Sequence, residues 1–87
     1  MKCQSQWWVY IVRCSDDSLY TGITVDKDRR VNEHNTSNKG AKYTRSRRPV
    51  QLVYSEKQEN RSLASKREST IKKLTRKDKL FLISKYK

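Results

Sequence analysis

Two short runs of strand-forming residues, separated by a turn cluster, constrain the fold of this chain more than any other feature. Residues 7–12 read WWVYIV and residues 19–24 read LYTGIT. Both runs are rich in aromatic and β-branched side chains, which favour strands. Residues 15–18 read SDDS, a cluster that is typical of a turn. The sequence therefore predicts an antiparallel β-hairpin over residues 7–24.

The segment after the hairpin predicts a helix, a loop and a third strand. Thr24 and Asp26 are candidate N-caps for a short helix over residues 27–35. Residues 36–48 have no apolar periodicity, and we expect a basic loop there. Apolar and polar side chains alternate over residues 50–55, which is the pattern of a half-buried strand with Val50, Leu52 and Tyr54 on one face.

Two helices are expected in the last third of the chain. Asn60 can cap a helix over residues 61–74, with an apolar stripe formed by Leu63, Ala64, Ile71 and Leu74. Thr75 and Asp78 form a start signal for a short final helix, which we expect to pack through Leu80, Phe81 and Ile83. The order β-β-α-β-α-α predicts an α/β fold with a small antiparallel three-stranded sheet flanked by helices, in one domain over residues 1–87.

Positive charge is concentrated after the hairpin. The formal net charge is +12, yet residues 1–25 carry two basic and two acidic side chains and so contribute nothing to it. An acid-free block over residues 35–49 contains Lys39, Lys42, Arg45, Arg47 and Arg48. Such a block is typical of a surface that binds nucleic acid. We therefore predict that these five side chains bind nucleic-acid phosphates; the alternative is a solvated surface that favours solubility.

Several classes of protein do not fit this composition. No run approaches the ~20 apolar residues of a membrane span, so we expect no membrane association. One histidine and two separated cysteines, Cys3 and Cys14, make a zinc site a poor fit. We expect reduced thiols in a cytoplasmic protein, with a Cys3–Cys14 disulfide as the alternative. The only glycines, Gly22 and Gly40, provide neither a nucleophile elbow nor a phosphate-binding loop.

The residues that remain for chemistry resemble one family. Val9-Tyr10-Ile11 followed by Tyr20-Thr21-Gly22 resembles the paired motifs of the GIY-YIG nuclease superfamily, with Val9 and Thr21 in place of its glycine and isoleucine. Arg30 and His34, which share a helix face, are similar to its R-x-x-x-H helix. Glu68, at the border of the apolar stripe, resembles its metal-binding glutamate, and residues 39–54 are similar to the short stand-alone bacterial members.

The resemblance implies a metal-dependent endonuclease that hydrolyses phosphodiester bonds of nucleic acid, with DNA as the expected substrate and repair or processing as its task. Glu68 would hold one Mg²⁺ or Mn²⁺ ion, and Arg30 would bind the scissile phosphate with its planar donor fork. Tyr10 would act as the general base if the metal and the arginine lower its pKa. Tyr20 and His34 would orient water, phosphate or Tyr10.

A second hypothesis, from another class, is a non-catalytic protein that binds DNA or structured RNA through the same basic loop. Glu68 separates the two hypotheses. A carboxylate close to phosphates repels them unless a metal ion neutralises it. A glutamate among Lys66, Arg67, Lys72 and Lys73 therefore favours the enzyme.

Tyr10 and Tyr20 must lie on one face of the hairpin if they serve one site. Facing residues of an antiparallel pair have numbers with a constant sum, and side chains alternate between faces. A four-residue loop pairs Cys14 with Leu19, a sum of 33, which places the tyrosines on opposite faces. An even sum places them on the same face. We therefore predict an odd-length loop or a bulge between Cys14 and Tyr20.

Overall fold

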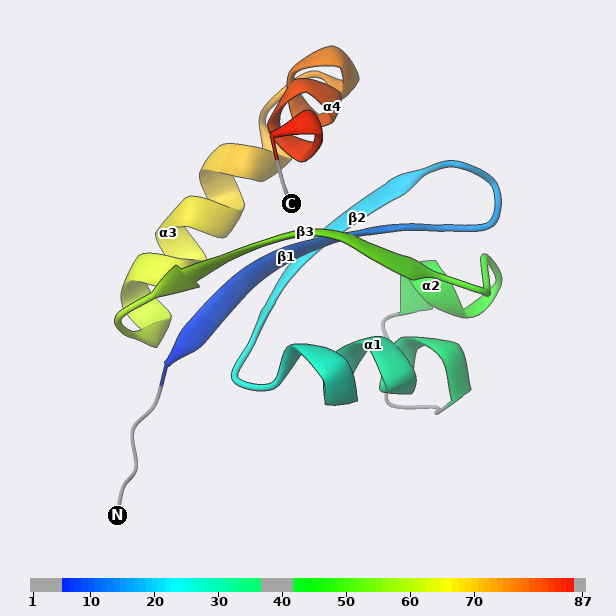
Figure 1. Ribbon diagram of the computed structural model, residues 1–87, viewed down its shortest axis with the longest axis horizontal. Coiled ribbons are helices and arrows are strands. Elements are labelled where there is room, and N and C mark those ends of the chain that lie inside the picture. The colour runs from blue at the N-terminus through cyan, green and yellow to red at the C-terminus, as the bar shows by residue number, and fades with distance from the viewer. Residues whose placement is uncertain (1–5, 37–41, 86–87) are drawn as a thin grey trace.

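The fold is built on a three-stranded antiparallel sheet with strand order β2-β1-β3 (Figure 1). The computed structural model describes residues 6–36 and 42–85. In chain order its elements are β1 (Trp7–Arg13), β2 (Leu19–Thr24), α1 (Lys27–Thr36), α2 (Lys42–Arg45), β3 (Gln51–Gln58), α3 (Arg61–Lys72) and α4 (Arg76–Ser84). This arrangement confirms the predicted α/β class. Every helix among the described residues falls short of the length and apolarity that a membrane span requires.

The register of the β1–β2 hairpin places Tyr10 and Tyr20 on the same face of the sheet. Tyr10 faces Gly22 and Val12 faces Tyr20, so each pair sums to 32 and both tyrosines lie on the same face. The backbone NH of Cys14 donates to the carbonyl of Ser18 at 2.8 Å, which leaves an odd-length turn between them. Asp17 adopts a left-handed φ of 72° there, a conformation that aspartate tolerates better than most residues. The prediction of an odd-length loop is therefore confirmed.

The central strand β1 buries side chains on both faces of the sheet. Val9 and Ile11 pack with Ala64 and Ile71 under α3. Tyr10 and Val12 of the same strand, and Cys14 just after its end, form a second cluster with Val50 on the opposite face. Helices α1 and α2 lie on this second face, and α3 and α4 lie on the first (Figure 1). Because both faces are covered, residues 7–12 read as one continuous apolar run.

Strand β3 departs from the predicted alternation. Val12 pairs with Leu52, whereas Ile11 pairs with Tyr54, so Val53 is an extra residue in a β-bulge. Leu52 therefore packs against the cluster that contains Tyr10 and Val12, while Tyr54 packs on the other face of the sheet, against the cluster under α3. The prediction that Val50, Leu52 and Tyr54 share one face is wrong for Tyr54, because a bulge shifts the alternation by one residue.

The predicted helix starts are confirmed by their capping hydrogen bonds. The Asp26 carboxylate accepts from the Arg29 NH at 3.1 Å, the Asn60 side chain from the Leu63 NH at 2.9 Å, and the Thr75 hydroxyl from the Asp78 NH at 3.1 Å. One helix was not predicted: α2 is a single turn within the expected loop. A single turn has no periodicity to detect, and the buried side chain of Thr44 anchors it instead.

Two predictions about apolar packing are wrong in part. Ala64 and Ile71 of α3 are fully buried, but Leu63 is 39% exposed. In α4, Ile83 contacts the core as predicted, but Leu80 is 41% exposed and Phe81 is 63% exposed. Leu82 contacts the core in their place. The contacts of a short helix depend on how it rotates against the sheet, which the sequence pattern does not specify. Cys14 is a buried free thiol, while Cys3 and Gly40 lie outside the described residues.

Candidate functional site

The side chain of Tyr10 crosses the edge strand at its glycine. A Cβ atom on Gly22 would lie 2.6 Å from the Tyr10 hydroxyl oxygen and 2.8 Å from Cζ, so only glycine leaves room for the ring. The ring is almost completely buried, and its hydroxyl lies 2.8 Å from Nε2 of His34. Gly22, the last residue of the Tyr20-Thr21-Gly22 motif, is therefore explained by packing. Its missing side chain lets Tyr10 reach His34 on α1.

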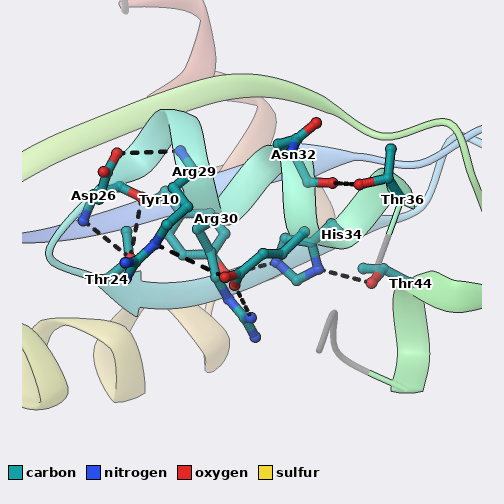
Figure 2. Close-up of polar contacts among 10 residues, drawn as sticks. Tyr10, Thr24, Asp26, Arg29, Arg30, Asn32, His34, Thr36 and Thr44 are labelled. Carbon is teal, nitrogen blue, oxygen red and sulfur yellow. Dashed lines mark hydrogen bonds and ion pairs between the residues drawn. The ribbon is translucent and has the colours of Figure 1, made fainter. Parts of the chain in front are cut away.

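His34 lies at the centre of a hydrogen-bonded chain that starts at Tyr10. Its Nδ1 lies 2.8 Å from the hydroxyl of Thr44, so the imidazole joins α1 to β1 and α2 (Figure 2). Arg30, one helical turn earlier, lies close enough to the Tyr10 hydroxyl to act on its pKa, lowering it. In the tautomer that is protonated at Nδ1, His34 donates to the Thr44 hydroxyl and Nε2 accepts from the Tyr10 hydroxyl.

Thr44 is the functional neighbour that sequence reasoning missed. It is fully buried on α2 and makes its contact with His34 across ten residues of sequence. The only signal in the sequence was its place in the stretch that resembles the short bacterial members. A threonine in a basic segment gives no other sign of pairing with a histidine, because the pairing depends on how α2 docks on α1.

Burial decides the charge states of this cluster. Desolvation, assisted by the nearby Arg30 guanidinium, lowers the pKa of His34 to about 4, so the imidazole is neutral at pH 7. Burial raises the pKa of Tyr10 to about 12, although Arg30 acts in the opposite direction. Arg30 alone therefore does not lower the Tyr10 pKa as a general base requires. Any lowering must come from a further positive charge, such as a metal ion bound nearby.

Tyr20 contacts the same histidine from the neighbouring strand. Its ring meets His34 edge-on with centroids 5.5 Å apart, and it stacks on Tyr43 at 5.8 Å. Arg47 lies over the Tyr43 ring at 4.1 Å. The structure therefore brings Tyr10, Tyr20, Arg30 and His34 together in one cluster.

Glu68 approaches this cluster from the other side of the sheet. It lies on α3, its side chain is 21% exposed, and its carboxylate pairs with Nζ of Lys72 at 3.4 Å. The carboxylate is near enough to Tyr10 to act on its pKa, raising it. The border position predicted from the helix pattern is confirmed. Its approach to Tyr10, by contrast, depends on how α3 packs on the sheet.

The donor atoms around Glu68 fit only a weakly chelated hard ion. Among the described residues no cluster of three His, Cys, Asp or Glu side chains could enclose a metal. Mg²⁺ needs no such cage, because one or two carboxylates suffice when water and substrate phosphates complete its octahedron. Glu68 is therefore compatible with one Mg²⁺ or Mn²⁺ ion, provided that the substrate supplies further oxygen ligands.

The basic block is only partly a free surface. Arg47 donates to the Asp16 carboxylate at 3.0 Å and to the Tyr43 carbonyl at 2.8 Å, which ties α2 to the hairpin turn. Arg48 donates from Nε to the carbonyl of His34. Both arginines thus hold the site together, whatever else they bind. Lys42 and Arg45 are exposed on α2, and Lys39 lies outside the described residues.

We expect Gly22→Ala to destabilise the protein by about 1–3 kcal/mol, because the added methyl group overpacks the buried Tyr10 ring. Urea unfolding measures this change. Thr21→Val is the matched control on the same strand. It removes a buried hydroxyl that has no partner among the described residues, and so should be neutral or stabilising. Equal stability of Gly22→Ala and wild type would contradict the packing described for Tyr10.

The free energy of unfolding should decrease as the pH is lowered, because His34 becomes protonated in the unfolded state first. The unfolded imidazole binds a proton near pH 6.5, whereas in the folded protein its pKa is about 4. Between these values the unfolded state holds more protons, so the free energy of unfolding falls by about 2 kcal/mol from pH 7 to pH 5. His34 is the only histidine of the chain. Urea unfolding of His34→Gln should show no such fall, and an equal fall would exclude His34 as its cause.

Comparison with known proteins adds a family match to this geometry. The family model of the GIY-YIG catalytic domain matches residues 6–83. A UPF0213 protein of Desulfotalea psychrophila is 64% identical over 69 residues, which cover 79% of this chain and 63% of that protein. The chain thus spans slightly less than two thirds of that relative. A UPF0213 protein of Syntrophus aciditrophicus is 53% identical over 79 residues, covering 91% of each.

Two solution NMR structures are similar to this chain over most of its length. The UPF0213 protein BH0048 from Bacillus halodurans is 44% identical with a TM-score of 0.58, covering 91% of this chain and 83% of that one. The protein EF2693 from E. faecalis is 48% identical with a TM-score of 0.59 and the same coverage. Both likenesses support the sheet and flanking helices described above.

Proposed function

We propose, from the premise that this chain belongs to the GIY-YIG family of nucleases, that it is a metal-dependent endonuclease acting on DNA. The family implies a nucleic-acid substrate. Metal dependence, the choice of DNA, a repair or processing task and a cytoplasmic location are the finer parts of the proposal. The observation that carries it is the convergence of Arg30, Tyr10 and His34 in one hydrogen-bonded cluster, with Glu68 within electrostatic range.

We propose that Arg30 holds the phosphate. Its side chain is 25% exposed and is oriented by Glu33, whose carboxylate accepts from it at 2.9 Å. It also lies close enough to the Tyr10 hydroxyl to act on its pKa. Its planar fork suits a phosphate oxygen and would stabilise the charge that develops during attack.

We propose that Tyr10 accepts the proton of the attacking water and that His34 positions Tyr10. In the resting protein the proton stays on Tyr10, because burial keeps the phenol neutral and His34 weakly basic. A divalent ion bound by Glu68 would supply the positive charge that favours deprotonation nearby and neutralises the phosphate. The hydrogen bond with Nε2 holds the Tyr10 hydroxyl in place, and Thr44 holds the ring of His34 from its other nitrogen. Tyr20 holds that ring in place from its edge.

Recognition through shape and backbone fits this domain better than base reading. Such contacts to phosphates position a nuclease without specifying sequence. The exposed cations Lys42 and Arg45 on α2 lie on the same side of the sheet as Arg30. We propose that they contact the phosphates of the bound strand, together with Lys39.

A panel of labelled DNA and RNA substrates tests this function. Single strands, duplexes, flaps, branched junctions and damaged duplexes are incubated with the protein in Mg²⁺, in Mn²⁺ or in EDTA. We expect cleavage of at least one DNA structure with either ion and none in EDTA. Binding without cleavage of any substrate would instead support the alternative, a non-catalytic nucleic-acid-binding protein. In that case Glu68→Lys should bind more tightly than wild type, since it removes a repulsive carboxylate.

A further inference from the structure

The outward face of α3 is a second cationic surface, separate from the basic block. A shallow groove runs along this helix and is lined by residues that include Arg61, Ser62, Ser65, Lys66, Ser69 and Lys73. The buried residues of α3, Ala64 and Ile71, point the opposite way. Helix α3 also lies across the sheet from α2, which carries Lys42 and Arg45 (Figure 1).

The chemistry of this groove is that of a phosphate-binding surface. It is lined by cationic side chains and hydroxyl groups, and no acidic residue lines it among the described part of the chain. Hydroxyl groups between cations can donate to phosphate oxygens, as serine and threonine commonly do on nucleic-acid backbones.

The spacing of the cations suits the repeat of a nucleic-acid strand. Ser62, Lys66, Ser69 and Lys73 follow one another at helical intervals of four, three and four residues, so they form one stripe. Lys66 and Lys73 lie about 10 Å apart along the helix axis. Arg61 also lines the groove, at the flank of the stripe and about 18 Å along the axis from Lys73. With about 3.4 Å of duplex axis per phosphate on each strand, the three cations span about five phosphates.

The stripe is continuous with the candidate site. Lys72 lies between Glu68 and the stripe on the helix circumference, and its ammonium group pairs with the Glu68 carboxylate. A strand that leaves the groove across the helix, past Lys72, therefore approaches the carboxylate. The basic block approaches the same cluster from the other face of the sheet.

We propose that the outward face of α3 binds the phosphodiester backbone of the nucleic-acid substrate, on the side of the cleavage site opposite the basic block. This inference rests on the proposed function. It assigns Lys66 and Lys73 to phosphate contacts and makes the substrate one that spans both faces of the domain. Because the contacts are to backbone, the face binds without sequence preference.

The test compares two charge-matched double variants. Lys66→Gln/Lys73→Gln removes two cations from the groove, and Lys57→Gln/Lys77→Gln removes two exposed cations from β3 and α4. Binding to a labelled DNA duplex, to an RNA duplex and to polyglutamate is measured in EDTA across a salt series. We expect the groove variant to lose about 1.8 from the slope of log K against log salt on DNA, which is up to about 60-fold in affinity at 0.1 M salt. The control variant should keep the wild-type slope.

Equal slopes for the groove and control variants would overturn the proposal. So would a groove variant that loses affinity for polyglutamate but keeps its slope on duplexes, since the face would then recognise acidic proteins. Binding in EDTA does not depend on cleavage. Absence of cleavage by the wild type would refute the proposed nuclease, while an unchanged slope in a cleaving protein would refute only the role of α3.

Discussion

Glu68→Gln should reduce cleavage by about 1000-fold or more while leaving the protein folded and able to bind nucleic acid. The neutral amide cannot provide the negative charge that holds a divalent ion, and the loss of such an ion removes several kcal/mol of transition-state stabilisation. The effect on stability should be small, because the carboxylate is partly exposed and its described ion pair is a surface contact with Lys72. Single-turnover cleavage, urea unfolding and binding in EDTA measure the three properties.

Glu59→Gln is the matched control for this variant. Glu59 is an exposed glutamate between β3 and α3, and its loss removes the same charge. It should cleave at close to the wild-type rate. Rapid cleavage by Glu68→Gln, or by the wild type in EDTA, would remove Glu68 and the divalent ion from the mechanism.

Arg30→Ala should lower kcat by about 100- to 1000-fold, the usual cost of losing one preorganised donor at a developing charge. Arg30→Lys should recover little of this loss, because an ammonium group lacks the planar fork that serves phosphate, Tyr10 and Glu33 together. Cleavage is measured at saturating substrate so that weaker binding does not mimic slower chemistry.

The neighbouring arginine provides the control. Arg29 has the same charge on the same helix, but it is largely exposed, and its 3.8 Å pair with Glu33 is looser. Arg29→Ala should therefore affect binding slightly and kcat hardly at all. Equal losses of kcat in the two alanine variants would mean that only the charge of α1 matters, and Arg30 would have no role at the phosphate.

Much of the local structure could be predicted because it depends on residues close together in the chain. The turn residues and the requirement that Tyr10 and Tyr20 share a face predicted an odd-length loop or a bulge, and the structure has the odd-length loop. The caps at Asp26, Asn60 and Thr75 follow from side chains that satisfy backbone NH groups three residues away. Arg30 and His34 could be assigned to one face of α1 because residues four apart in a helix lie on the same face.

The sequence by itself therefore determined the hairpin, the helix starts and the list of side chains available for chemistry, since each follows from local geometry and residue type. Only the tertiary structure decided which of these side chains meet. The contact of His34 with Thr44, the passage of Tyr10 over Gly22, the bulge at Val53 and the approach of Glu68 from the far face all join segments that are distant in sequence. Such contacts arise from the packing of elements against both faces of β1, and that packing also sets the pKa values of Tyr10 and His34 through burial.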